Sequence, residues 1–277
     1  MRHLPQALAA AALLIGATLT SAADVHGLTE GKPEIKSVDV LAFGPNGILF
    51  VGDTQSAAVF ALQTGDKSGK PADANINVAG LNVKIAEKLG GNSQNLKIND
   101  LAVNPATGNV FVAVTNSDKP ALVKVDGQGA ISAVSLEKIP FAKAELPDAP
   151  APGEVQVGGR GRNLRADVIT DIAFVDGQLL VTGTNNSNSP AGVRSLAFPF
   201  SKVDNAATLE IFHGAHGRKE NYAVPRTFVP FTIGGEPNLL AGFVCTPLVR
   251  FPVKDVQSGH EISKTVAELG NRHGCRT

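Results

Sequence analysis

The stretch VLAFGPNGILFVGDTQSAAVFAL, residues 40–62, carries the pattern that decides the fold of this chain. An apolar run is followed by a turn with Asn-Gly, a second apolar run, a short polar gap and a third apolar run. Asn-Gly between β-branched and aromatic runs is a strong hairpin signal. The stretch therefore predicts three consecutive antiparallel strands.

The strand–turn–strand unit recurs along the chain with the same polarity pattern. Its three clear copies are VDVLAFGPNGILFVG (38–52), INDLAVNPATGNVFVAV (98–114) and ITDIAFVDGQLLVTG (169–183). Further strands are expected at 57–62, 121–125, 131–136 and 192–198, with a degenerate fourth unit at 227–253. Such self-similarity at a regular interval is the signature of a repeat architecture.

The spacing of these units predicts a β-propeller, because units recur every 55–70 residues or so, the scale of blades with long loops. We expect an all-β fold of four-stranded antiparallel blades, about four to five in number, over residues 24–277. The inserts at 70–95 and 141–167 are expected to be loops, the first with a helical turn at 83–89. Because VAELGNRHGCRT ends just after a strand-like segment, we expect an incomplete, C-terminally truncated ring.

Residues 1–23 have the composition of a secretory signal peptide. Arg2 precedes an apolar stretch from Ala7 to Leu19, and small residues follow at 21–23. That stretch is shorter than the roughly 20 residues that cross a bilayer, and no later stretch is long and apolar enough to do so. The mature protein is therefore expected to be secreted or periplasmic, without a membrane span.

Charge and cysteine content narrow the classes of partner. The chain has 25 basic and 25 acidic residues, so no global field favours nucleic acid. Cys245 and Cys275 allow a disulfide in an oxidising compartment, or a buried strand thiol and a separate terminal thiol. No CxxCH is present, so the sequence does not support covalent haem attachment. The composition therefore leaves a ligand or a protein of unknown identity as the expected partner.

The segment LAFGPNGILFVGDTQSAAVFAL (41–62) resembles a blade of the NHL and gluconolactonase (senescence marker protein) type of propeller. In that type an apolar inner strand, a Gly turn and LFVxD recur. The likeness covers most of the mature chain, and GAHGRKE, RTFVPF, CTPLVRFPV and VAELGNR also resemble exported bacterial propeller proteins. The resemblance implies a fold and a compartment, and it brings no activity with it.

Asp100 and Asp171 occupy the same place in two repeats, directly before the apolar core of the first strand. In a propeller this strand lines the central channel, so the two carboxylates could converge on one divalent cation such as calcium. The alternative, which we favour, is a structural role as acceptors of backbone hydrogen bonds at the strand entrance. The first repeat has Val40 at this place.

Three further motifs have a structural interpretation beside a functional one. Asp53 is expected to hold a turn through backbone amides. His213 and His216 in HGAHGR suit a flexible surface loop, with a metal or catalytic pair as the alternative. The Gly-rich GGRGRNLRAD suggests a solvated loop between blades, or an anion site formed by Arg160, Arg162 and Arg165.

Two functions fit these observations. The first is a binding or scaffold module with an unknown ligand at its loops and channel mouth. The second is a lactonase or esterase resembling the gluconolactonase family, with a cation in the channel that polarises a carbonyl or activates water. Those enzymes use Glu, Asn and Asp from separate blades. In this sequence only Asp100 and Asp171 are candidates for such a set.

Overall fold

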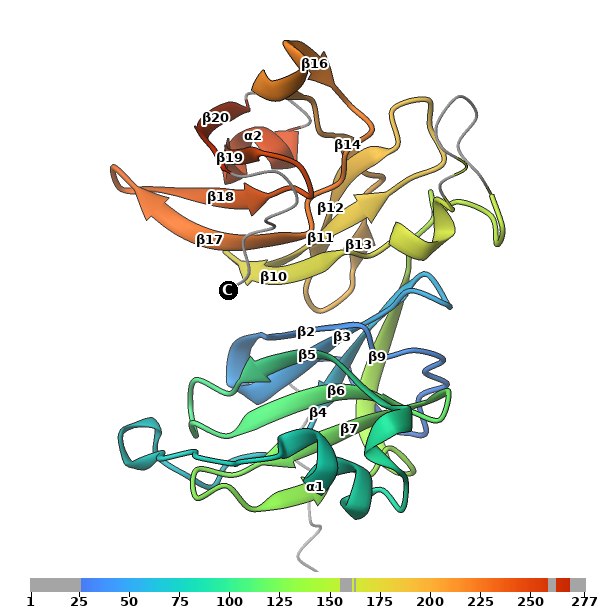
Figure 1. Cartoon of the computed structure of the whole chain (residues 1–277), viewed down its shortest axis with the longest axis vertical. Coiled ribbons are helices and arrows are strands. Elements are labelled where there is room, and N and C mark those ends of the chain that lie inside the picture. Colours follow the sequence, from blue (N-terminus) through green and yellow to red (C-terminus); the bar gives the residue numbers. More distant parts are fainter. Residues whose placement is uncertain (1–25, 155–160, 162, 259–262, 270–277) are drawn as a thin grey trace, which may run out of the picture.

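The computed structural model describes residues 26–154, 161, 163–258 and 263–269 (Figure 1). The predicted signal peptide and Cys275 lie outside the described residues. Within them the chain is all-β, with four antiparallel sheets arranged as the blades of a propeller. The predicted fold class is therefore confirmed.

Blade 1 contains the stretch that predicted the fold. Asn46 and Gly47 have φ of 55° and 74°, the left-handed backbone that its Asn-Gly turn requires. From the channel outward, its strands are β2 (Val40–Phe43), β3 (Ile48–Asp53), β4 (Ala58–Gln63), β9 (Ile139–Glu145) and β1 (Thr29–Gly31).

Blade 2 is built from the second repeat and is covered by the predicted helical segment. Its strands are β5 (Leu96–Val103), β6 (Val110–Asn116), β7 (Lys119–Val125) and β8 (Ile131–Ala133). Helix α1 (Leu81–Lys88) buries Ile85 completely against Val112 and Val123 of this sheet. The insert at 70–95 is thus a loop with a helix, as expected.

The prediction that the insert at 141–167 is a loop is wrong for its first residues, because they belong to strand β9. The chain leaves blade 1 after β4, forms all of blade 2 and then returns, so that β9 pairs with β4 in antiparallel register from Ala58–Glu145 to Leu62–Phe141. The edge of β4 would otherwise present unpaired backbone groups. This return is a long-range pairing that local polarity does not reveal.

Blades 3 and 4 follow the third and fourth units. Blade 3 contains β10 (Asp171–Val175), β11 (Gln178–Thr184), β12 (Ala191–Ala197), β13 (Lys202–Val203) and β14 (Ala207–Thr208). Blade 4 contains β17 (Thr227–Ile233), β18 (Glu236–Gly242), β19 (Pro247–Pro252) and β20 (Lys264–Glu268), with helix α2 (Val253–Ser258) between the last two. The ribbon β15 (Ile211–His213) and β16 (Arg218–Glu220) connects the two blades. Short 3-10 turns lie at Pro45–Gly47, Pro71–Asp73, Ser93–Asn95, Arg165–Asp167 and Gly214–His216.

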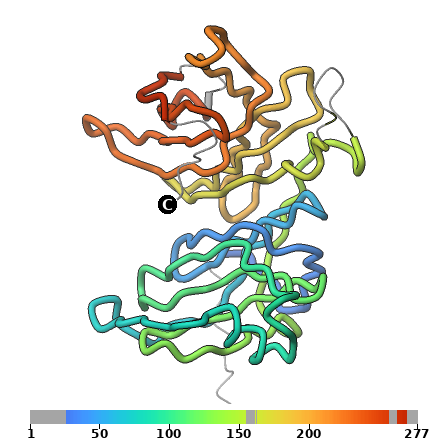
Figure 2. Tube along the Cα trace, in the orientation of Figure 1, coloured from blue at the N-terminus to red at the C-terminus, as the bar shows by residue number. Residues whose placement is uncertain are grey.

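Shared apolar cores show that the blades follow one another in the order 2, 1, 3, 4. Leu49 of blade 1 and Phe111 of blade 2 lie in one core. Phe50 of blade 1 and Leu179 of blade 3 lie in a second core, and Leu180 and Phe228 join blades 3 and 4 in a third. Figure 2 shows blades 1 and 2 stacked at one end of the molecule and blades 3 and 4 at the other. The innermost strands therefore succeed one another as β5, β2, β10 and β17.

The described helices do not approach the length and hydropathy of a membrane-spanning segment.

Candidate functional site

The four innermost strands line a cavity of about 1240 Å³. Strands β5 and β2 contribute one side, and β10 and β17 the other, so the two halves of the molecule face each other across it (Figure 1). Four of the residues that line it are aspartates, against one lysine and one arginine: Asp39, Asp100, Asp167 and Asp171, with Lys97 and Arg226. The cavity lining therefore has more negatively charged hydrogen-bond acceptors than cations.

Asp100 lies on β5 and binds the adjacent blade. Its Oδ2 accepts a hydrogen bond from the backbone N–H of Leu41 on β2 at 2.8 Å. Burial raises the pKa of the Asp100 carboxyl above its ordinary value, while the backbone hydrogen bonds from Leu41 and Leu101 act in the opposite direction. Asp100 thus ties blade 2 to blade 1.

Asp171 begins β10 and makes the equivalent contact between blades 3 and 4. Its Oδ2 accepts the N–H of Phe228 on β17 at 2.7 Å, and its Oδ1 accepts the N–H of Ile172 at 2.8 Å. Burial raises the pKa of the Asp171 carboxyl to about 6, against the hydrogen bonds from Phe228, Ile172 and Thr227, and the negative charge of Asp100 adds to the rise.

The two aspartates occupy equivalent positions in their blades, as the alignment of INDLAV with ITDIAF predicts. Asp100 pairs with Ala113 and Asp171 with Thr182, and both line the same cavity. Each bonds the innermost strand of the next blade in the order 2, 1, 3, 4. The structural interpretation expected acceptance of nearby amides, and the structure shows that one amide accepted by each aspartate belongs to a different blade. Blade 1 has Val40 at this place and makes no such tie.

The same cavity is where the resemblance implies a cation site. Asp100 and Asp171 already accept backbone amides, Asp39 accepts the N–H of Thr54 at 2.9 Å, and Asp167 pairs with Arg226 at 2.5 Å. A calcium ion takes six to eight oxygen ligands at roughly 2.3–2.6 Å. Each of these carboxylates thus has an amide or arginine donor on part of its acceptor positions, so a cation would have to share the oxygens with these donors, and the cation site stays a prediction.

Asp53 has the structural role that its sequence position predicted. The residue is completely buried at the end of β3. Its carboxylate accepts the N–H of Lys36 at 2.7 Å, the N–H of Ser37 at 3.1 Å and the N–H of Ser56 at 2.9 Å. The side chain therefore fastens the segment before β2 to the turn after β3.

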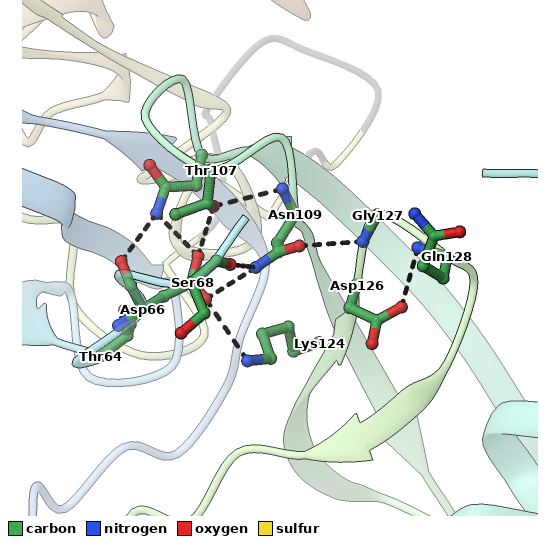
Figure 3. A network of polar contacts seen from close by, with 10 residues as sticks. Thr64, Asp66, Ser68, Thr107, Asn109, Lys124, Asp126, Gly127 and Gln128 are labelled. Atoms are coloured by element: carbon green, nitrogen blue, oxygen red, sulfur yellow. Dashed lines mark hydrogen bonds and ion pairs between the residues drawn. The ribbon is translucent and has the colours of Figure 1, made fainter. Parts of the chain in front are cut away.

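A second buried carboxylate, Asp66, was not singled out in the sequence. Its Oδ2 accepts hydrogen bonds from Asn104 at 2.8 Å and Thr107 at 2.6 Å, and its Oδ1 from Asn109 at 2.8 Å, with Lys124 at 3.3 Å (Figure 3). We call these five residues the Asp66 cluster. Burial would raise the pKa of Asp66, but the hydrogen bonds from Thr107, Asn109 and Asn104 and the charge of Lys124 outweigh it and lower the pKa.

An ion pair between blade 3 and the segment that precedes it was also not predicted from the sequence. Arg194 on β12 is fully buried, with Nε 2.6 Å from Oδ1 of Asp148. Its remaining nitrogens donate to the carbonyls of Val168 at 3.1 Å and Thr184 at 2.7 Å. The only signal in the sequence was an arginine within the apolar strand GVRSLAF.

The HGAHGR segment is not the flexible surface loop that the sequence suggested. Residues 211–213 and 218–220 pair as the ribbon β15–β16, and the ring of His213 is buried. The spacing of the two histidines reflects a 3-10 turn between the strands, and both rings contact Glu220.

Part of the Gly-rich motif, including Arg160 and Arg162, lies outside the described residues. The described Arg165 donates to the carbonyls of Pro150 at 2.9 Å and Gln55 at 2.8 Å. Arg165 thus has a structural role in joining neighbouring loops.

Comparisons with known proteins give distant similarity only. No protein-family model matches the chain, and no curated protein matches it. A streptogramin B lyase structure matches with 14% identity and a TM-score of 0.31, over 87% of this chain and 72% of that one. The virginiamycin B lyase of Staphylococcus aureus matches with 12% identity and a TM-score of 0.33, over 86% and 74%. A PQQ-bound aldose sugar dehydrogenase from Streptomyces coelicolor matches with 12% identity and a TM-score of 0.25, over 87% and 86%. The likeness to the NHL and gluconolactonase type stays a prediction.

Proposed function

We propose that this protein is an exported binding module whose central cavity takes a small polar ligand. The observation that carries the proposal is the cavity of about 1240 Å³ onto which all four blades converge. Ligand pockets commonly measure roughly 300–1,000 Å³, so the space is sufficient for a small molecule together with water. In this proposal the ligand binds in the cavity, and the blades serve as a rigid frame.

The lining residues favour a ligand that donates hydrogen bonds or carries positive charge. An ionised carboxylate offers about four acceptor positions, and the hydrogen bonds to backbone amides occupy only part of those on Asp100 and Asp171. Amines and hydroxyl-rich compounds are the chemical classes that use such acceptors. Arg226 is held by Asp167, with a second hydrogen bond at 3.3 Å, which reduces its availability for an anion.

A ligand screen on the mature protein tests the proposal. Amines, polyols and anionic compounds are compared by thermal shift, and hits are measured by calorimetry. The Asp171→Asn variant is expected to lower the affinity of a cationic hit about tenfold, a loss of roughly 1.4 kcal/mol. Glu137→Gln is the matched control, because this exposed carboxylate pairs with Lys32 and does not line the cavity. Binding that Asp171→Asn leaves unchanged would contradict the proposal.

The alternative is a metal-dependent lactonase or esterase, supported by the presence of two carboxylates from different blades in one cavity. Metal analysis of the purified protein and a screen of lactones and esters distinguish it from binding. A stoichiometric cation that is lost in Asp100→Asn or Asp171→Asn without unfolding, together with hydrolysis, would replace the binding proposal. Removal of the signal peptide is tested separately, by mass spectrometry of the exported protein, where an intact Met1 would contradict it.

A further inference from the structure

We propose that His213, His216 and Cys245, none of which lines the central cavity, form a site for one zinc-class metal ion. The two histidines lie in the β15–β16 ribbon, and Cys245 lies in the bend between β18 and β19. One ring nitrogen of each histidine and the sulfur of Cys245 lie within 4.8 Å of one another. Residues from two separate segments, 29 or more positions apart in the chain, thus meet at one point.

Glu220 orients both imidazole rings. Its Oε2 lies 2.9 Å from Nδ1 of His213, and its Oε1 lies 2.7 Å from Nδ1 of His216. A carboxylate only accepts hydrogen bonds, so Nδ1 is the protonated nitrogen of each ring and Nε2 carries the lone pair. A histidine that binds a metal through one nitrogen almost always donates its other N–H to such a carboxylate.

The second observation is a buried ring nitrogen without a partner. Nε2 of His213 has no hydrogen-bond partner in the described part of the chain, although the side chain is only 3% exposed. Buried polar atoms are nearly always satisfied, and an exception calls for a ligand or an ion. A metal ion at Nε2 satisfies this atom and uses the lone pair that Glu220 leaves available.

The donor set selects the metal. Two imidazole nitrogens and one thiolate suit zinc and neighbouring transition metals, whereas calcium and magnesium require oxygen ligands. Zinc–ligand distances of about 2.0–2.3 Å place the ligand atoms of a tetrahedral site roughly 3.3–3.8 Å apart. The three donor atoms, which all lie within 4.8 Å of one another, therefore need to approach by up to about 1.5 Å to reach this geometry. Three protein ligands leave the fourth position to water or another small ligand.

The ribbon that carries the histidines is anchored on the side of blade 4. The N–H of Gly214 donates to Oε1 of Glu268 at 2.9 Å, and a Cβ at this glycine would lie 2.7 Å from that oxygen. Nε of Arg218 donates to Oε1 of Glu220 at 3.1 Å. Glu220 thus has a fixed position, and a bound ion would fasten the ribbon to the segment between β18 and β19.

The test is cobalt and zinc binding by the mature, reduced and metal-free full chain. We expect one equivalent of Co²⁺ to bind with the visible bands of tetrahedral cobalt and a thiolate charge-transfer band. Cys245→Ser is expected to lose the charge-transfer band, and Cys275→Ser, the matched cysteine control, is expected to keep it. His216→Gln changes an exposed ring and is expected to weaken zinc binding at least tenfold while circular dichroism shows a folded protein.

Glu220→Gln tests the orienting role separately. The amide oxygen replaces only one of the two carboxylate acceptors, so zinc affinity is expected to fall about 10–100-fold with the thiolate band retained. The site is overturned if the full chain binds no stoichiometric Co²⁺ or Zn²⁺. It is equally overturned if folded Cys245→Ser and His216→Gln bind the ion as the unaltered chain does.

Discussion

The carboxylates of Asp66, which is buried, and of Asp171, which is half-buried, both hold blades together, yet their pKa values move in opposite directions. Asp66 joins the loop after β4 in blade 1 to the turn of blade 2, and its pKa is lowered. Asp171 joins blade 3 to blade 4 across the edge of the cavity, and its pKa is raised to about 6. Burial penalises the ionised form in both places.

The difference between them lies in the donors. Asp66 receives three side-chain hydrogen bonds and the charge of Lys124, which together outweigh the cost of burial. Asp171 has backbone donors and one hydroxyl, no cation among its contributors, and the negative Asp100 nearby. A buried carboxylate thus stabilises the contact between two blades more when its hydrogen-bond donors and nearby cations outweigh the cost of burying its charge. Where they do not, the contact is weaker and its strength depends on pH.

Removal of Asp66 is expected to have the largest effect. In Asp66→Ala the side chains of Asn104, Thr107 and Asn109 lose their acceptor inside the protein, and the free energy of unfolding should fall by about 3 kcal/mol. Urea denaturation measures this change. Asp73→Ala, at an exposed position of the same connecting segment, should change it by less than about 0.5 kcal/mol. Equal effects of the two variants would show that the Asp66 cluster contributes no stability.

The pH dependence of stability separates the two carboxylates by sign. The lowered pKa of Asp66 contributes stability that is present above its unfolded pKa and lost as the pH falls through its folded pKa. For Asp171 the folded state holds the proton more tightly, so stability falls by about 1–3 kcal/mol as the pH rises from 3.8 to about 6. Denaturation curves measured across this pH range should show the fall in stability assigned to Asp171 in the unaltered chain, and Asp171→Asn alone should lose it. An unchanged profile in that variant would contradict the assigned burial.

Asp171→Asn is expected to cost only on the order of 1 kcal/mol at neutral pH. The amide oxygen can still accept the N–H of Phe228, and the variant removes a charge that burial disfavours. Asp100→Asn should behave in the same way, because its carboxylate accepts one amide of the adjacent blade. Thermal and urea unfolding measure both, and a loss as large as that of Asp66→Ala would remove the contrast between the regions.

The smallest expected effect is electrostatic coupling between the two aspartates. Because the charge of Asp100 raises the pKa of Asp171, the variant Asp100→Asn should move the titration of Asp171 to lower pH. Carbon-detected NMR titration of the Asp171 carboxyl measures this directly. A shift to higher pH, or none, would show that the two carboxylates are electrostatically independent.

Local polarity and turn chemistry were sufficient to predict the hairpins, the three clear repeats and the equivalence of Asp100 and Asp171. Asn-Gly, Thr-Gly and Asp-Gly are signals that act within a few residues, so the turn after β2 and its relatives could be found in the sequence. The turn-holding role of Asp53 was also predicted from its position after the second strand, whereas its burial was not. A repeated pattern also requires that equivalent residues occupy equivalent places in successive blades.

Only the tertiary structure decided which distant segments meet. The return of β9 to blade 1 depends on the unpaired edge of β4, about 80 residues earlier in the chain, and no property of residues 139–145 records it. The donors of Asp66 come from a turn some 40 residues further on, and Cys245 reaches the histidines from another strand connection. Hydrogen bonds and ligand sets depend on distances in space, whereas the sequence records order along the chain. The sequence therefore determined the kind of blade, and the packing of the blades determined where the carboxylates, the cavity and the histidine pair came together.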